Sequence, residues 1–210
     1  MKGIFISFEG PDGSGKTTQI KLLSSYLEEK GYSVVMTREP GGTAISEKIR
    51  EIILDPENKE MDGMTEALLY AAARAQHVAQ IIKPSLDEGK VVLTDRFMDS
   101  SIAYQGYGRH LGDKIRTINE YAVAGTQPDI TFFLDISAEE GIKRAEHRNK
   151  LDRLEKESLD FHRTVYEGYM ELAKIYPGRF VIIDASGSIE DVFEDIKGRF
   201  EEYAKDHEEQ

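Results

Sequence analysis

Five short runs of apolar residues alternate along the chain with longer stretches of mixed polarity. Because each run is almost continuously apolar, it is typical of a parallel strand that is covered on both faces. The runs are Ile4–Phe8, Tyr32–Thr37, Val91–Thr94, Ile130–Asp135 and Phe180–Ile183. The stretches between them repeat apolar residues at helical spacing, as in Thr17–Lys30 and Thr65–Glu88, and each of these two is followed by a glycine that suits a helix end. The pattern predicts a doubly wound α/β fold, with a five-stranded parallel sheet flanked by helices.

Nothing in the 210 residues divides the chain, since it has no internal repeat, low-complexity tract or Ser/Pro-rich linker. We therefore expect a single domain over residues 1–210. From Ser188 onward, apolar residues recur at helical spacing within an acidic segment, which predicts a C-terminal amphipathic helix docked on the sheet. Ligands of such folds bind at the carboxyl ends of the strands, so the loops after the strands are where chemistry is expected.

The charge balance limits the partners that the chain can have. Its 27 Lys and Arg residues against 39 Asp and Glu give a net charge of −12. This argues against nucleic acids and anionic membranes, which bind to a dominant basic face. The chain has no Cys, which excludes disulfides and thiolate metal sites. The N-terminal apolar run is too short for a secretory signal and no stretch is long enough to span a membrane, so a cytoplasmic protein is expected.

A phosphate-binding motif of the form G-x-x-x-x-G-K-T directly follows the first predicted strand. Its residues are Gly10, Pro11, Asp12, Gly13, Ser14, Gly15, Lys16 and Thr17, followed by Thr18. The glycines let successive backbone N–H groups turn towards an anion, and the helix that starts here directs its positive end at the same point. Lys16 is expected to reach the β- and γ-phosphates of ATP, and the Thr17 hydroxyl to bind Mg²⁺. The motif predicts a P-loop NTPase fold; a glycine-rich turn with an exposed lysine is the structural alternative.

An acidic residue ends the third predicted strand, where a second Mg²⁺ ligand is expected. Asp95 is suited to this role, and Arg96 beside it offers a bidentate phosphate-binding group. The alternative is an Asp that caps the next helix and an Arg that pairs with it on the surface. Asp135 ends the fourth strand and is a rival for the metal, but a helix starts just beyond it near Ser137, which favours a capping or structural role.

Several motifs occur in register and together closely resemble the thymidylate kinase family of the bacterial and archaeal type. The resemblance runs from about Phe5 to about Tyr169. It implies transfer of the γ-phosphoryl group of ATP to dTMP, for dTTP synthesis. The motifs are Phe8-Glu9-Gly10 with Gly15-Lys16-Thr17-Thr18, Thr37-Arg38-Glu39-Pro40-Gly41-Gly42-Thr43, Asp95-Arg96-Phe97, Ser100-Ser101-Ile102-Ala103-Tyr104-Gln105-Gly106 and Leu151-Asp152-Arg153-Leu154-Glu155.

The resemblance implies a role for each matching residue of the acceptor site. Arg96 and Arg38 would bind the acceptor phosphate, and Glu9 would lie near the sugar and the metal. Tyr104 would crowd the ribose 2′ position and so favour the deoxy sugar.

The thymine pocket is implied on the third helix and on the segment after Asp95. Tyr70 would stack on the base, although the family usually has Phe there, and Arg74 would hydrogen-bond it. Ser100, Ser101 and Gln105 would line the pocket. From the residues alone, Tyr70 and Arg74 are a surface pair at i, i+4, with Leu68, Leu69, Ala72 and Ala73 in the core.

Residues 143–156 resemble the mobile lid of these kinases, which closes over the nucleotide phosphates. A solvated helix surface is the alternative for this basic segment. The cradle has no Arg at Pro11 and Asp12, so the resemblance implies that the lid supplies it: Arg148 and Arg153 are the candidate catalytic residues, with Arg144 third.

Other functions remain possible at this point. Another nucleotide or nucleoside kinase, acting on dUMP, CMP, UMP, AMP or GMP, would need a different base pocket. A GTP-binding switch module would use the N-K-x-D sequence at residues 149–152, but the charged helical pattern before it is the wrong context. Finally, the resemblance implies a homodimer.

Overall fold

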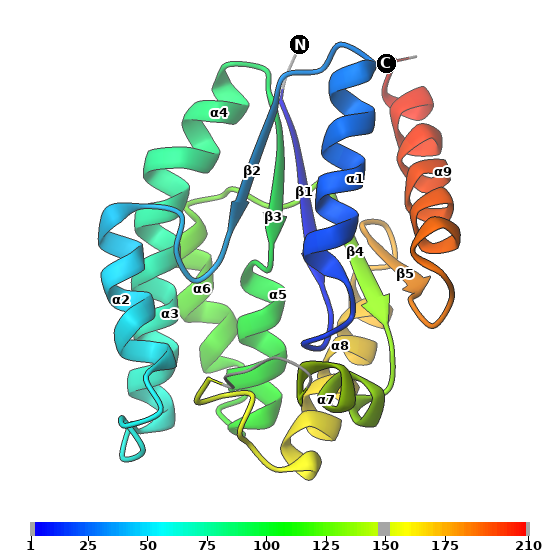
Figure 1. Cartoon of the computed structure of the whole chain (residues 1–210). Helices are drawn as coiled ribbons and strands as arrows, with labels where there is room; N and C mark the ends of the chain where they lie inside the picture. The colour runs from blue at the N-terminus through cyan, green and yellow to red at the C-terminus, as the bar shows by residue number, and fades with distance from the viewer. Residues whose placement is uncertain (1–2, 147–151, 209–210) are drawn as a thin grey trace.

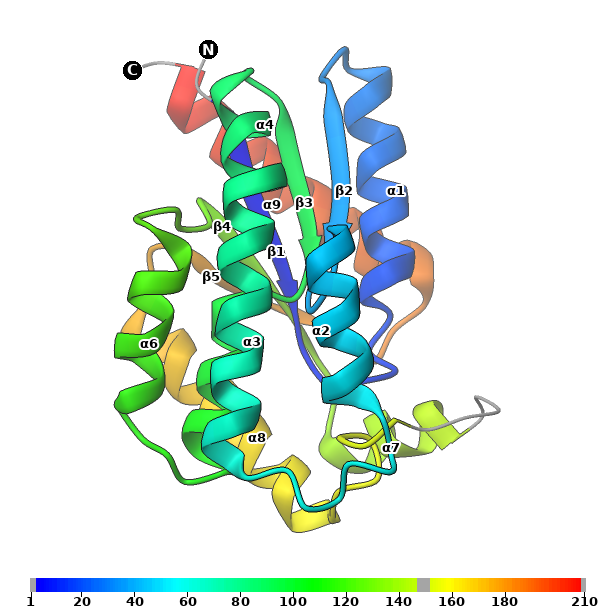
Figure 2. The same cartoon turned by 90° about the vertical axis from the view of Figure 1, so that its left-hand side faces the viewer.

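The computed structural model describes residues 3–146 and 152–208. Within these residues, parallel strands form a five-stranded sheet in the order β2-β3-β1-β4-β5 (Figures 1 and 2). The strands are β1 (Ile4–Glu9), β2 (Val34–Arg38), β3 (Val91–Asp95), β4 (Ile130–Asp135) and β5 (Phe180–Asp184). The predicted fold class is therefore confirmed.

Helices follow the strands and cover both faces of the sheet (Figure 1). They are α1 (Lys16–Glu29), α2 (Ala44–Leu54), α3 (Gly63–His77), the π-helical η1 (Val78–Ile82), α4 (Lys83–Asp87), α5 (Met98–Ser101), the π-helical η2 (Ile102–Gly108), α6 (Lys114–Val123), α7 (Ala138–Glu146), α8 (Leu159–Ile175) and α9 (Ile189–Glu208). No helix among the described residues is both long and apolar enough to cross a membrane.

The strand predictions are correct to within two residues. β2 starts two residues later than predicted, because Gly31 adopts a left-handed φ of 89° and the N–H of Tyr32 still bonds to Leu27 of α1, at 3.0 Å. The expectation that every strand is covered on both faces is wrong for the edge strands. Met36 on β2 is 53% exposed and Ile182 on β5 is 41% exposed, so one face of each edge strand is partly open to solvent.

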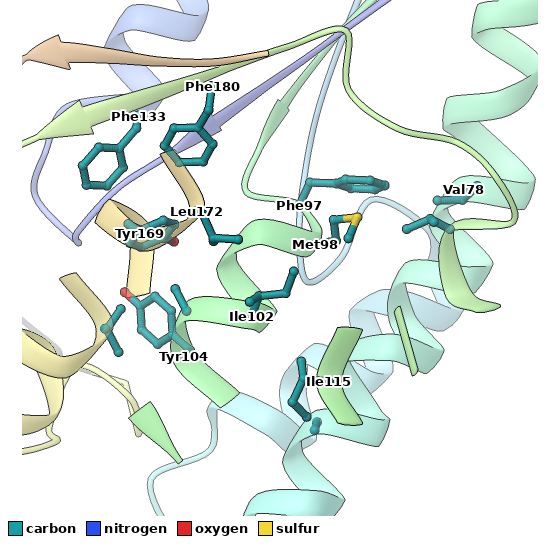
Figure 3. Close-up of a cluster of buried hydrophobic side chains, with 14 of the residues drawn as sticks. Val78, Phe97, Met98, Ile102, Tyr104, Ile115, Phe133, Tyr169, Leu172 and Phe180 are labelled. Atoms are coloured by element: carbon teal, nitrogen blue, oxygen red, sulfur yellow. The ribbon is translucent and has the colours of Figure 1, made fainter. Parts of the chain in front are cut away.

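Successive side chains of the central strands enter two separate cores. On β1, Phe5 enters the core beneath α3, α5, η2 and α8, whereas Ile6 enters the core beneath α1 and α9. Figure 3 shows part of the first core, in which Tyr104 from η2 and Tyr169 from α8 lie close together, with a centroid distance of 6.4 Å between their rings.

The stretch predicted to be helical at Thr65–Glu88 is helical up to Asp87, but it buries a different set of side chains from the one predicted. It begins earlier, because the Asp62 side chain caps its N-terminus by accepting from Met64 N–H at 2.9 Å. Leu68 was expected in the core and is 52% exposed, whereas Arg74 is buried rather than on the surface. Ala72 is also exposed, whereas Ala73 is buried as expected, so the buried face of α3 was predicted only in part.

The sheet register brings three functional loops to one edge. Phe8 of β1 and Arg38 of β2 both pair with Asp95 of β3, so the carboxyl ends of these strands lie side by side. Because the strands are parallel, their carboxyl ends all lie at the same edge of the sheet, and the loops that follow them meet at that edge.

Candidate active site

The loops at this edge surround a cavity of about 520 Å³. The predicted residues that line it are Asp12, Gly13, Gly15, Lys16, Thr17, Thr18, Arg38, Tyr70, Asp95, Arg96, Ser100, Ser101, Tyr104, Gln105 and Arg144. The residues that line it without having been assigned a role are Glu39, Pro40, Arg50, Leu54, Asp152, Leu154 and Glu155. The cavity thus joins the glycine-rich loop to Tyr70 and Gln105 in one continuous space.

The loop after β1 turns back on itself through residues that only glycine suits. Gly10 has a φ of 136°, and a Cβ there would lie 2.7 Å from the carbonyl oxygen of Leu134 on β4. Gly15, with a φ of 95°, precedes the first residue of α1. The N–H groups at the start of this helix have no partners within the helix, which creates a site for an anion.

Lys16 lies across this loop rather than extending into solvent. Its Nζ donates to the carbonyl oxygens of Gly10 at 3.1 Å and Pro11 at 2.9 Å. Burial, together with the nearby charge of Arg96, lowers the pKa of Lys16 to about 8. Lys16 is thus still mainly protonated at neutral pH and can bind phosphate oxygens.

Thr17 and Asp95 form a direct pair at the mouth of the loop. The Thr17 hydroxyl donates to Oδ2 of Asp95 at 2.8 Å. Two adjacent hard oxygen ligands fit Mg²⁺, which usually takes one or two protein ligands and completes its shell with phosphates and water. The described residues include no cluster of three or more His, Cys, Asp or Glu, so they build no all-protein metal cage.

Asp135 belongs to a different environment and does not line the cavity. Its backbone carbonyl accepts from Ala185 at 3.0 Å. Its carboxylate is hydrogen-bonded by Tyr166, whose pKa rises through burial and this bond. The following helix is capped by Ser137, whose hydroxyl accepts from the N–H of Glu140 at 3.2 Å. Asp135 therefore holds neighbouring segments together and does not itself cap the helix.

Arg96 occupies the centre of the site in a strained backbone conformation, with a φ of 70°. Its guanidinium donates to Oδ1 of Asp12 at 2.8 Å, to the hydroxyls of Ser100 and Tyr169 at 3.0 and 3.1 Å, and to that of Tyr104 at 3.2 Å. Burial alone would lower the pKa of Arg96, but Tyr104 and Asp12 raise it well above its usual value. The group is thus a fixed cation held rigidly at the cavity wall.

Glu9 lies beneath Arg96, with an exposed fraction of 0%, and does not line the cavity. Its carboxylate accepts from Phe97 N–H at 2.8 Å, from Ser100 at 2.6 Å and from Tyr169 at 3.0 Å. Burial and the charge of Asp99 raise the pKa of Glu9 to about 7, against the lowering effect of these bonds. In this structure Glu9 supports the residues around Arg96 from below.

Arg74 is buried next to the cavity and does not line it. Its Nε donates to Glu39 at 2.7 Å, and Nη2 donates to the carbonyl of Phe97 at 2.9 Å. Nη1 donates to the Ser101 hydroxyl at 2.9 Å and also to Asn119. Because Ser101 lines the cavity, Arg74 fixes one of the groups on the cavity wall.

Glu39 and His77, which were given no individual role from the sequence, form a buried network behind Arg74. Glu39 accepts from Arg74 with one oxygen and contacts His77 Nδ1 at 2.9 Å with the other, while His77 Nε2 contacts the Thr37 hydroxyl at 2.7 Å. Gly42 leaves room for this ring, since a Cβ there would lie 2.8 Å from it. The Glu-Pro-Gly-Gly sequence after β2 was the available signal.

Arg38 stands at the rim of the cavity and is 46% exposed as a side chain. Its guanidinium binds both carboxylate oxygens of Glu47 at 3.0 Å and the carbonyl of Pro40 at 3.0 Å. Arg50, on the next turn of α2, donates to the same carbonyl at 2.8 Å. Two cations that line the cavity therefore converge on one carbonyl group.

Known proteins resemble this sequence along almost the whole chain. A family model described as thymidylate kinase matches residues 8–196. The chain belongs to the thymidylate kinase family. The thymidylate kinase of Bacillus licheniformis is 50% identical over 210 residues, which is 99% of each chain. That of Lactobacillus acidophilus is 54% identical over 200 residues, 93% of each chain.

A solved structure agrees with the fold. Thymidylate kinase from Ehrlichia chaffeensis superposes with a TM-score of 0.77 at 36% identity, covering 95% of this chain and 99% of that one. The thymidylate kinase family membership is consistent with the P-loop NTPase fold predicted from the loop after β1. It also removes the alternative of a GTP-binding switch module.

The predicted lid arginines of this thymidylate kinase family member are placed differently from one another. Arg144 lines the cavity, bonding to Glu140 at 2.8 Å and to the carbonyl of Ala185 at 3.3 Å. Arg153 is instead turned towards α2 and α3, where it bonds to the carbonyl of Ile53 at 2.8 Å and to Glu66 at 2.6 Å. Arg148 lies outside the described residues, as do the first three residues of the N-K-x-D sequence.

Proposed function

We propose that this cavity holds the triphosphate of ATP in the glycine-rich loop and dTMP between Arg96 and Tyr70. As a member of the thymidylate kinase family, the chain is a dTMP kinase that forms dTDP from dTMP and ATP. The observation that carries the residue assignment is the continuity of the cavity from Lys16 to Gln105. Both substrates can therefore bind in one continuous space.

The donor side uses the loop N–H groups, Lys16 and the Thr17–Asp95 pair. Lys16 would leave the loop carbonyls and follow the β- and γ-phosphates. Thr17 and Asp95 would hold Mg²⁺, directly or through water, and the ion would neutralise charge on the phosphates when bound.

The acceptor side uses fixed cations for the phosphate and a half-apolar pocket for the base. Arg96 is held by four oxygen partners and presents a rigid fork, and Arg38 lines the same cavity. Tyr70 would stack on thymine, with Ser100, Ser101 and Gln105 around it and Arg74 acting next to the base. Tyr104, beside Asp12, would face the sugar, and Glu9 would act from beneath it.

No general base is required, because the acceptor phosphate is already an anion. Catalysis then depends on holding the two substrates in line and stabilising the charge of the transferring phosphoryl group. We propose that residues 143–156 act as the lid within a single domain, and that Arg144, Arg148 and Arg153 are its candidate cations. For Arg153 this requires release from Glu66 on closure.

A panel of monophosphates tests the proposal. The purified protein is incubated with ATP and Mg²⁺ and with dTMP, dUMP, dCMP, dAMP or dGMP, and ADP formation is followed. We expect dTMP to be the best acceptor. Lys16→Ala should reduce turnover by on the order of a thousandfold or more while the thermal unfolding midpoint changes little. Turnover of dTMP at the wild-type rate by that variant would contradict the role of the loop.

We also propose a homodimer, formed through an apolar face on one side of the molecule. Ile45 and Ile52 on α2 and Leu68 on α3 are each about half exposed, at 54%, 49% and 52%. These two helices lie side by side at the surface (Figure 2). Exposed apolar groups that gather in this way are typical of an interface. A cytoplasmic location is proposed as well, since ATP, the co-substrate, is made and used there.

A further inference from the structure

One buried carboxylate outside the catalytic loop contacts a residue of the proposed base pocket. Glu66, in the first turn of α3, has an exposed fraction of 0%. Its Oε1 accepts from Nε2 of Gln105 at 2.9 Å. Arg109 and Arg153 donate to its Oε2 at 3.0 and 2.6 Å. Both oxygens are therefore occupied, and one of their partners lines the cavity.

The charge state of Glu66 determines whether its carboxyl group can donate a hydrogen bond or only accept one. Burial by itself raises the pKa of Glu66, but the hydrogen bonds from Arg109 and Gln105 outweigh burial and lower it. An ionised carboxylate only accepts hydrogen bonds. The atom of the Gln105 amide that faces it must consequently be the NH₂ group, whatever the other end of the amide contacts.

The other end of the amide is the carbonyl oxygen Oε1. It is buried and has no hydrogen-bond partner among the described residues, while Gln105 as a whole is 1% exposed. A buried carbonyl oxygen without a partner is costly, so a ligand that donates a hydrogen bond to it binds better than one that cannot. An imide base such as thymine or uracil carries a proton on N3, whereas cytosine has a lone pair there.

We propose that Glu66 is a positioning residue that determines base specificity by fixing the Gln105 amide with its carbonyl oxygen towards the base. This rests on the proposed function, in which Gln105 lines the thymine pocket. Without this contact, the Gln105 amide could rotate by about 180° and present either its carbonyl oxygen or its NH₂ group. It could then bind a base with a proton on N3 or a base with a lone pair there. Glu66 prevents that turn without touching the substrate.

The test is the discrimination between bases in Glu66→Gln. This change keeps the shape of the side chain but lets position 66 donate as well as accept, so either amide orientation becomes possible. We expect the ratio of kcat/KM for dTMP over dCMP to fall by roughly thirtyfold, the value of one hydrogen bond to a charged group. The ratio for dTMP over dUMP should remain unchanged, because both bases carry the N3 proton.

Arg109→Met is the matched control for a purely structural role. It removes another hydrogen-bond donor to the same carboxylate, while Arg153 still donates to Oε2 and keeps the carboxylate in its accepting form, so the Glu66–Gln105 bond stays in place. It should lower the unfolding midpoint without changing the dTMP over dCMP ratio by more than about threefold. An equal loss of discrimination in both variants would overturn the proposal, as would an unchanged ratio in folded Glu66→Gln.

A second variant tests the amide orientation should Glu66→Gln not fold. In Gln105→Glu, two carboxyl groups lie together and share a proton, which leaves an accepting oxygen towards the base. The preference for dTMP over dCMP should persist, and its collapse would mean that the base contacts the NH₂ group instead. Wild-type protein with no preference for dTMP would refute the proposed function itself, which is a distinct outcome.

Discussion

The buried carboxyl of Glu9 predicts a specific dependence of stability on pH. Its pKa is about 7 in the folded protein, against an ordinary value of 4.5, because burial and Asp99 disfavour the charged form. Glu9→Gln preserves the shape of the side chain and removes the titrating group. The amide oxygen can still accept from Phe97 N–H, and the hydroxyls of Ser100 and Tyr169 can rotate to accept from the amide NH₂.

The number of protons bound by the folded and unfolded states determines whether the free energy of unfolding rises or falls with pH. Below pH 4.5 the carboxyl is protonated in both states, so it contributes no pH dependence. Between 4.5 and about 7 the unfolded chain releases the proton while the folded protein keeps it, and stability falls as the pH rises. At about 1.4 kcal/mol for each pKa unit, the full loss is roughly 3 kcal/mol.

Urea denaturation of wild type and Glu9→Gln from about pH 4.5 to about pH 8 measures this difference. The free energy of unfolding of wild type minus that of the variant should decline by roughly 3 kcal/mol over this range and level off above about pH 8. Glu140 on the surface supplies a control: Arg144 lowers its pKa below 4.5, so the difference between wild type and Glu140→Gln should not fall anywhere in this range. A flat difference for Glu9→Gln would refute the reasoning, as would one that rises with pH.

The remaining predictions concern single contacts of the site and the surface. Arg96→Lys should raise KM for dTMP at least about tenfold more than KM for ATP, since an ammonium cannot reproduce the planar fork, and steady-state kinetics with an equal effect on both substrates would contradict this. Arg74→Met leaves Glu39 buried opposite a neutral side chain and should lower the free energy of unfolding in urea by roughly 3 to 5 kcal/mol, whereas Arg199→Met, at an exposed pair, should cost less than about 1 kcal/mol. Leu68→Glu should convert a dimer into monomers in sedimentation equilibrium, and a dimer of unchanged strength would place the interface elsewhere.

The loop after β1 could be predicted because its conformation depends on residues that are adjacent in the chain. Its glycines, Lys16 and Thr17 are neighbours in the chain, and the conformation they need is set by the absence of a Cβ and by the start of a helix. The strands could be predicted for a similar reason, because continuous apolar runs have few arrangements other than a covered parallel sheet. The meeting of Thr17 with Asp95 followed from the same parallel topology, which gathers strand ends at one edge.

The sequence pattern failed where the orientation of a side chain depends on distant partners. Arg74 at helical spacing from Tyr70 was compatible with an exposed pair, and its burial depends on Glu39, 35 residues earlier, and on the carbonyl of Phe97, 23 residues later. The partner of Arg153 could not be predicted either, because Glu66 lies 87 residues before it in the chain.

The fold and the conformation of the glycine-rich loop could thus be predicted from local sequence, and the family resemblance indicated the reaction. Which charged side chains are buried, and which partners they take, became known from the three-dimensional arrangement, including the contact of Glu66 with Gln105. The physical reason is that burying a charge is unfavourable unless a partner is supplied, and in this protein the partners come from elements far apart in the chain.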